Sequence, residues 1–206
     1  MTRFFLAMLP VLAGFVWAGE FWTEKKPADW TAEEKTRLLT LSPWAKTVSV
    51  GLNQSREMDQ RRRSGMIYGP QGERAPNAIP KMQAVVRWET AEPVRAAGKP
   101  LPEEAKDHLV ISVSMTGALS APEDRPAAAD EELLRATSLQ SKGRMAVNPI
   151  LSLRDDHAGV IYFLFPAKDA VRAGDKEWEF ETTLGMLRLK AKFTAREMVL
   201  LGRPAL

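Results

Sequence analysis

Residues 177–193, EWEFETTLGMLRLKAKF, decide the fold, because apolar and charged side chains alternate along them twice in succession. The apolar positions are Trp178, Phe180 and Thr182, followed by Leu187, Leu189, Ala191 and Phe193. A period of two residues is typical of a strand with one buried face. The stretch therefore predicts an antiparallel hairpin with one face towards the core and a charged face towards water.

The charged rows also predict a register for this hairpin. If Leu184 and Gly185 form the turn, acidic and basic side chains face one another across the strands. The expected pairs are Glu181 with Arg188, Glu179 with Lys190 and Glu177 with Lys192, and Phe180 meets Leu189 on the buried side. Each pair contributes about 0.2–1 kcal/mol, and a slip by one residue would turn the apolar row towards water. We therefore interpret these charges as structural, not as catalytic carboxylates or a nucleic-acid surface.

Five other stretches show the pattern of strands, and three show that of helices. The strands are expected at residues 47–52, 84–88, 109–115, 150–154 and 160–165, and the helices at 31–42, 93–97 and 127–137. The first helix has a capping box, because Thr31 is followed three residues later by Glu34. Leu38, Leu39 and Leu41 give it an apolar side, and Pro43 ends it. We expect an α+β, β-rich fold, a mostly antiparallel sheet or sandwich-like β fold with two to three short helices.

The N-terminus carries the pattern of a secretory signal peptide. Arg3 precedes an uncharged, mostly apolar run, and Val16-Trp17-Ala18 fits a cleavage site. We expect cleavage after Ala18 and a single mature domain over residues 19–206, with residues 53–81 as a long flexible loop rich in glycine and proline. The alternative is an uncleaved anchor, although the apolar run is short for a bilayer. No membrane span is expected after cleavage.

The composition excludes several classes of function. Cysteine is absent, so the chain has no disulfide, thiolate nucleophile or thiol-bound zinc. The 29 basic and 26 acidic residues give a net charge of only +3, which does not favour nucleic-acid binding. The chain contains neither the Gly-x-Ser-x-Gly elbow of hydrolases nor a glycine-rich phosphate loop, and we expect no cofactor.

Two groups of residues are candidates for ligand or metal binding. Trp22, Trp30 and Trp44 flank the first helix and could stack against a sugar, or they could fix that helix on the core. Asp155, Asp156 and His157 form a cluster of metal-capable ligands between two expected strands, with oxygens that suit calcium. Aspartate is also common in turns for backbone reasons, and calcium needs about six to eight oxygen ligands.

Three stretches resemble a set of uncharacterised exported bacterial proteins. They are Phe21-Trp22 through Asp29-Trp30-Thr31 to Ser42-Pro43-Trp44-Ala45-Lys46, then Val86-Arg87-Trp88-Glu89 with Pro93-Val94-Arg95, and the hairpin from Lys176 to Phe193. The resemblance rests chiefly on the Trp-Thr capped helix and on Ser-Pro-Trp-Ala-Lys. It implies no activity, cofactor or site residue.

These observations favour an exported, periplasmic or secreted protein that binds an envelope protein or a glycan without catalysis. Two alternatives stay open. One is a hydrolase whose site is assembled from scattered Asp, Glu, His and Ser residues, His157 among them. The other is a structural component of an envelope assembly. The sequence does not indicate an oligomeric state.

Overall fold

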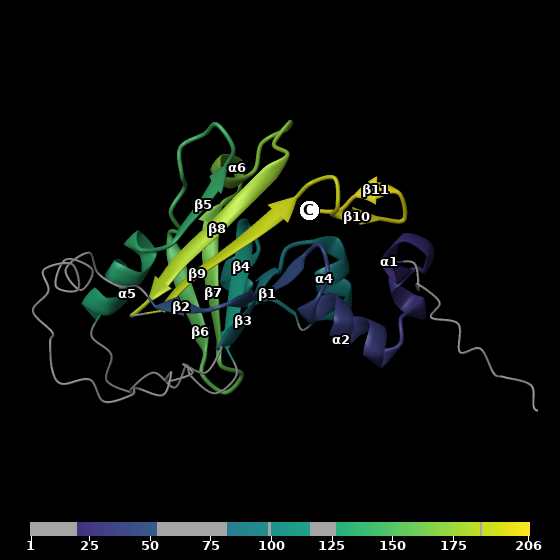
Figure 1. Cartoon of the computed structure of the whole chain (residues 1–206), viewed down its shortest axis with the longest axis horizontal. Helices are drawn as coiled ribbons and strands as arrows, with labels where there is room; N and C mark the ends of the chain where they lie inside the picture. Colours follow the sequence, from purple (N-terminus) through teal and green to yellow (C-terminus); the bar gives the residue numbers. More distant parts are fainter. Residues whose placement is uncertain (1–19, 53–81, 99, 116–126, 186) are drawn as a thin grey trace, which may run out of the picture.

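The computed structural model describes residues 20–52, 82–98, 100–115, 127–185 and 187–206. The expected signal segment, residues 1–18, and the expected loop, residues 53–81, lie outside the described residues. Two antiparallel sheets form the centre of the described part, with short helices around their ends (Figure 1).

The larger sheet has the strand order β1-β3-β4-β7-β6, with antiparallel neighbours throughout. Its strands are β1 (Ala45–Ser49), β3 (Gln83–Trp88), β4 (His108–Met115), β6 (Leu151–Asp155) and β7 (Val160–Pro166). The inner strands β4 and β7 are buried on both faces over most of their length. Burial on both faces explains why residues 160–165 are continuously apolar instead of alternating.

The smaller sheet has the order β2-β9-β8-β5 and is also antiparallel. Its strands are β2 (Gly51–Leu52), β5 (Ser138–Ser141), β8 (Glu177–Leu184) and β9 (Leu187–Thr194), and a separate hairpin pairs β10 (Val199–Leu200) with β11 (Arg203–Pro204). The sequence did not lead us to expect β5, β10 or β11. Strands of two to four residues are too short to show a convincing alternation.

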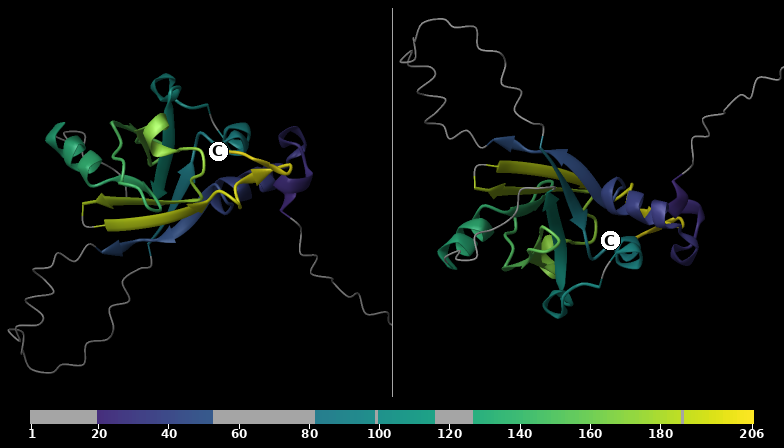
Figure 2. Two further views of the ribbon diagram at one scale, coloured as in Figure 1. Left: turned by 90° about the horizontal axis from the view of Figure 1, so that it is seen from above. Right: turned by 90° about the horizontal axis from the view of Figure 1, so that it is seen from below.

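The core lies between the two sheets, where their aromatic side chains meet. The ring centroid of Trp88, from β3, lies 5.2 Å from that of Trp178 and 5.3 Å from that of Phe193. The ring centroid of Phe180, from β8, lies 5.7 Å from that of Phe163 and 6.4 Å from that of Phe165, both in β7. In Figure 2 the yellow arrows of β8 and β9 run across the strands of the larger sheet. The sheets therefore pack with crossed strands.

The chain passes from one sheet to the other at Val50. We expected one strand over residues 47–52, but β1 pairs with β3 of the larger sheet, whereas β2 pairs with β9 of the smaller sheet. Between them, the N–H of Val50 donates to the carbonyl of Met82 at 2.9 Å. Such a bend is how crossed sheets share a corner.

Five short α-helices lie within the described ranges, more than the two to three expected. They are α1 (Phe21–Glu24), α2 (Ala32–Thr40), α4 (Glu92–Ala97), α5 (Ala127–Arg135) and α6 (Ala167–Ala170), and the 3-10 turns are η1 (Pro27–Asp29) and η2 (Glu103–Ala105). In these ranges no helix has the length and apolar character needed to cross a membrane. Of the described residues, 41% lie in strands and 25% in helices. The expected β-rich, antiparallel fold is therefore confirmed.

The capping box of α2 is confirmed. The hydroxyl of Thr31 accepts from the N–H of Glu34 at 3.2 Å, and the Glu34 carboxylate accepts from the N–H of Thr31 at 2.9 Å. Leu38 is fully buried, as expected. Leu41 is 64% exposed, so our assignment of this residue to the apolar side was wrong. It lies past the last helical residue, where the backbone has left helical geometry.

The expected hairpin faces are confirmed, but the expected register was wrong by two residues. Leu184 pairs with Leu187, so Glu181 lies opposite Lys190 and Glu179 opposite Lys192. A shift by two keeps every side chain on its own face, so the alternation could not distinguish the two registers. Diagonal contacts recover some expected partners, since Lys190 Nζ lies 2.9 Å from Glu179 Oε1.

Candidate functional site

The three tryptophans expected near the first helix lie in the core. Trp22, Trp30 and Trp44 are 2%, 5% and 0% exposed. Their indole N–H groups donate to Glu20 Oε2, the Lys25 carbonyl and the Ala205 carbonyl, respectively. Because the rings are covered and the N–H groups are satisfied internally, their geometry matches the interpretation in which they fix the helix on the core.

The cluster Asp155-Asp156-His157 lies at the turn between β6 and β7. Oδ1 of Asp155 accepts from the N–H of Ala158 at 3.0 Å, so this carboxylate holds the turn. Asp156 and His157 are exposed. Over the described ranges, these three included, no group of three or more histidine, cysteine or acidic side chains is arranged to hold a metal ion.

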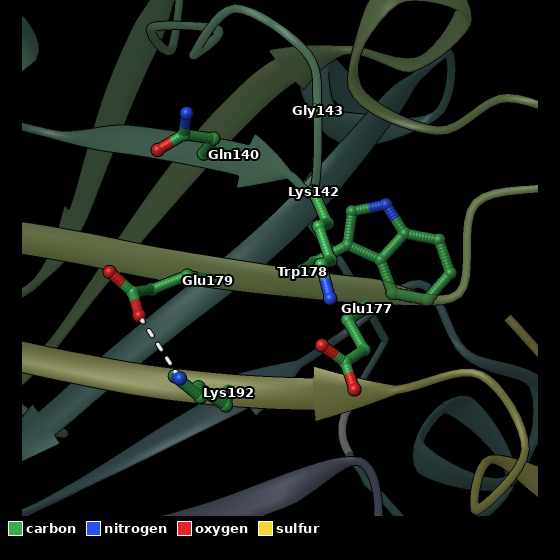
Figure 3. Close-up of a pocket in the computed structure, with 7 residues that line it drawn as sticks. All are labelled: Gln140, Lys142, Gly143, Glu177, Trp178, Glu179 and Lys192. Carbon is green, nitrogen blue, oxygen red and sulfur yellow. Dashed lines mark ion pairs between the residues drawn. The ribbon is translucent and has the colours of Figure 1, made fainter.

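An open hollow of about 410 Å³ lies where β5, β8 and β9 run side by side (Figure 3). It is lined by Gln140, Lys142, Gly143, Glu177, Trp178, Glu179 and Lys192. Gln140 pairs with Glu179, and Glu179 with Lys192, so these three side chains share the outer face of the smaller sheet. Trp178 alternates with the glutamates and is only 1% exposed. The hollow therefore has polar and charged walls beside a buried indole.

Two other hollows lie elsewhere on the described surface. One, of about 490 Å³, is lined by residues of α2 and by Leu41. The other, of about 440 Å³, lies between residues 144–147 and the chain around Asp169 and Arg172. We take the first hollow as the candidate site, because it brings acidic, basic and amide side chains together from three strands.

Ion pairs hold the charged rows beside the hollow. Lys190 Nζ lies 2.9 Å from Glu179 Oε1 and 2.8 Å from Glu181 Oε2. The hydrogen bond from Lys190 lowers the pKa of Glu179, and the bonds to Glu181 and Glu179 raise the pKa of Lys190. Burial alone would raise the pKa of Glu181, but hydrogen bonds from Lys190 and Arg188 outweigh it and lower that pKa. Both carboxylates are therefore held in the ionised form.

Two side chains of the hollow, and two indole N–H groups in the core, lack a partner among the described residues. The side chains of Lys142 and Glu177 make no hydrogen bond or ion pair to any other described residue. The indole N–H of Trp178 is buried without an acceptor, as is that of Trp88, which packs edge-on against it. A buried donor without a partner costs about 1–3 kcal/mol. The hollow thus presents an unpaired cation and an unpaired anion, whereas the two unpaired indole donors lie in the core.

Arg144 fixes the turn that carries residues 142–143. Its Nη1 donates to Asp175 Oδ2 at 2.6 Å, and its Nη2 donates to the carbonyl of Asp169 at 2.5 Å. Burial would raise the pKa of Asp175, but hydrogen bonds from the N–H of Arg172 and from a serine hydroxyl, together with Arg144, lower it. This wall of the hollow is therefore preorganised.

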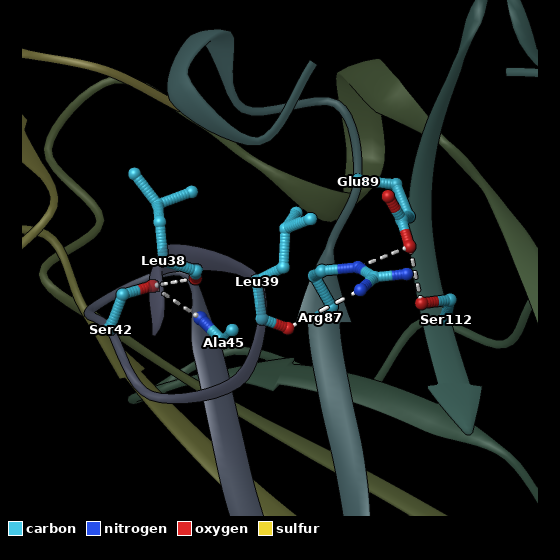
Figure 4. Close-up of polar contacts among 7 residues, drawn as sticks. All are labelled: Leu38, Leu39, Ser42, Ala45, Arg87, Glu89 and Ser112. Atoms are coloured by element: carbon cyan, nitrogen blue, oxygen red, sulfur yellow. Dashed lines mark hydrogen bonds and ion pairs between the residues drawn. The ribbon is translucent and has the colours of Figure 1, made fainter. Parts of the chain in front are cut away.

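A second polar cluster lies on the larger sheet (Figure 4). Oε1 of Glu89 accepts from Arg87 Nε at 2.7 Å and from Ser112 Oγ at 2.5 Å, and Arg87 Nη1 donates to the carbonyl of Leu39 at 3.3 Å. Burial and the charge of Glu89 raise the pKa of the nearby Tyr162. Ser112 is 1% exposed, so its hydroxyl is not presented to a substrate. We infer that this cluster holds α2 in place against β3 and β4.

Comparison with known proteins gives no match. No family model matches the chain, and no curated protein or solved structure matches it. The site is therefore interpreted from its own chemistry, and the resemblance to exported bacterial proteins stays a prediction from sequence motifs.

Sequence reasoning missed the hollow. Glu177, Glu179 and Lys192 were expected to face water, but we assigned them only to strand pairing. Gln140 and Lys142 lay in a stretch without an assignment. The glycine-containing turn at residues 142–143 is a weak signal for a strand before it, but residues 138–141 are too few, with one apolar side chain, to indicate β5 by alternation.

Proposed function

We propose that this protein is exported and acts in the periplasm or outside the cell as a non-catalytic binding module for an envelope protein or a glycan. The observation that carries the binding proposal is the hollow of the smaller sheet, where Lys142 and Glu177 are exposed without partners in the described chain. The export proposal is supported by the signal pattern of residues 1–18.

The electrostatics of the hollow favour binding over proton transfer. A catalytic carboxyl acid needs a raised pKa, whereas hydrogen bonds lower the pKa of Glu179 and Glu181. Paired carboxylates and ammonium groups on a rigid sheet are instead suited to orienting a polar partner. The fixed turn at residues 142–143 reduces the entropy lost on binding.

Export is tested by the mass of the mature product. The full chain is expressed in a Gram-negative host, and the periplasmic fraction is analysed by intact mass spectrometry. We expect a chain that begins at Gly19. An intact N-terminus in the membrane fraction would favour the anchor, and an intact chain in the cytoplasm would contradict export.

Binding is tested by retention from an envelope extract. The exported product is immobilised, and the retained proteins and glycans are identified by mass spectrometry. We expect a reproducible partner that is absent from a column carrying an unrelated exported protein. Retention of nothing above that control would contradict the binding module.

A further inference from the structure

We infer that the hollow between β5, β8 and β9 binds a short stretch of an electrically neutral, hydroxyl-rich glycan (Figure 3). This inference rests on the proposed function, because it names the ligand class of the same site. It follows from the charge balance of the lining, from its hydrogen-bonding groups and from the absence of an exposed apolar anchor within that lining.

The charges of the lining cancel. Two lysines, Lys142 and Lys192, face two glutamates, Glu177 and Glu179. A ligand of either net charge would bring like charges together as well as opposite ones, which opposes binding. A neutral ligand avoids this repulsion, and its binding should depend little on salt.

The lining offers both donors and acceptors. Lys142 supplies N–H donors and Glu177 supplies acceptor oxygens. The amide nitrogen of Gln140 donates to the carbonyl of Arg144 at 3.1 Å, so its oxygen is left to accept. A sugar hydroxyl both donates and accepts, so adjacent hydroxyls of one ring can satisfy a lysine and a carboxylate together.

The indole of Trp178 lies on the inner face of β8, among the core residues, and is not a ligand-binding group of the hollow. Its N–H has no acceptor among the described residues, although Trp178 lines the hollow and is 1% exposed. Buried indole N–H groups usually have a partner. The unpaired donor therefore belongs to the core between the sheets, and the ligand class follows from the charged and amide side chains alone.

A protein partner fits the hollow less well. The centre of a protein interface is depleted in charged residues and depends on aromatic or arginine anchors set in apolar pockets. Here the exposed lining is charged or polar, and the only aromatic member of that lining is buried. The volume, about 410 Å³, lies in the usual range for a small ligand.

Two double variants distinguish an effect of the hollow on binding from a general effect of surface charge. Lys142→Ala/Glu177→Ala removes one positive and one negative charge from the hollow. Lys106→Ala/Glu103→Ala removes the same charges from an exposed ion pair at η2, where the side chains are 68% and 78% exposed. Both variants keep the net charge, and both should fold like the wild type.

The test is calorimetric titration of the exported product with neutral cellotetraose, maltotetraose and chitotetraose, and with tetragalacturonate and tetralysine as charged probes. We expect at least one neutral probe to bind, and the charged probes to bind at least tenfold more weakly. The hollow variant should weaken neutral binding at least tenfold, and the η2 variant less than twofold. In nitrogen-15 spectra the backbone amide signal of Trp178, a lining residue, should shift on binding, while that of Trp44 should not.

The outcomes distinguish the ligand class from the proposed function. If a charged probe binds more tightly than the neutral ones, the inference is overturned. It is also overturned if neutral binding is unchanged in the hollow variant or leaves the Trp178 signal in place. If no neutral probe binds but the hollow variant loses a partner from the extract, the proposed binding function is supported and the inferred glycan ligand is rejected. If no probe binds and nothing is retained, both fail.

Discussion

Glu89 places a carboxylate at a position that is only 6% exposed. Burial of a charge is costly unless partners replace its water. Arg87 and Ser112 supply those partners, and Arg87 is itself held by a carbonyl at the end of α2. The cluster therefore stabilises one arrangement of helix and sheet, and loss of Glu89 removes the acceptor shared by Arg87 Nε and the Ser112 hydroxyl.

Glu89→Ala should lower the free energy of unfolding by about 3 kcal/mol, because the Arg87 side chain, only 19% exposed, loses its carboxylate partner. Glu103→Ala, which breaks an exposed pair, should cost less than about 1 kcal/mol. Urea denaturation followed by tryptophan fluorescence measures both. Equal losses in the two variants would contradict a stabilising role for the buried pair.

The lowered pKa values of Glu179 and Glu181 predict that the folded protein loses stability in acid. Their pKa values are lowered in the folded protein, so their stabilisation is full above the ordinary pKa of glutamate and is lost as the pH falls through the folded value. Wild-type stability should therefore fall more steeply between about pH 5 and pH 3 than that of Glu179→Gln/Glu181→Gln. Urea midpoints across this range measure the difference, with Glu103→Gln/Glu104→Gln as the exposed control. Parallel curves for all three proteins would contradict a lowered pKa at these two glutamates.

At the scale of the element, α2 begins and ends on side-chain hydrogen bonds. The capping box satisfies N–H groups at its start. At its end, Ser42 Oγ donates to the carbonyl of Leu38 at 2.7 Å and accepts from the N–H of Ala45 at 3.1 Å (Figure 4). These bonds set where the helix stops and β1 starts.

Thr31→Ala removes the cap and should lower the free energy of unfolding by about 1 kcal/mol. Thr36→Ala, in the same helix, is the matched control. Thr36 lies within the helix and its hydroxyl donates back to the carbonyl of Ala32, so alanine there should be neutral or slightly stabilising. Thermal unfolding measures both, and a Thr31 variant as stable as the Thr36 variant would exclude a capping role.

Gly185 has φ of 62°, in the left-handed region, between β8 and β9. A Cβ there would meet open space, so the cost of Gly185→Ala comes from the backbone alone and should be about 1 kcal/mol. Gly51→Ala in β2 is the control, because its Cβ would make an ordinary 3.6 Å contact with the carbonyl oxygen of Arg188. Equal stability of the two variants would indicate another turn geometry.

At the scale of the whole molecule, local patterns predicted the strands better than their partners. The alternation of residues 177–193 predicted both faces of the hairpin, but not a register shift of two residues. Trp44 is fully buried, and its indole N–H donates to the carbonyl of Ala205, 161 residues away, which no local pattern indicates. The hollow unites β5 and the turn after it with β8 and β9, and the alternation of a single strand does not show such an assembly.

The most direct test of the account compares what the exported product, its Lys142→Ala/Glu177→Ala variant and its Lys106→Ala/Glu103→Ala variant retain from the same envelope extract. We predict that the wild type and the η2 variant retain the same partner in amounts within twofold of each other, and that the hollow variant retains at least tenfold less. Equal retention by all three proteins would contradict the assignment of binding to this hollow.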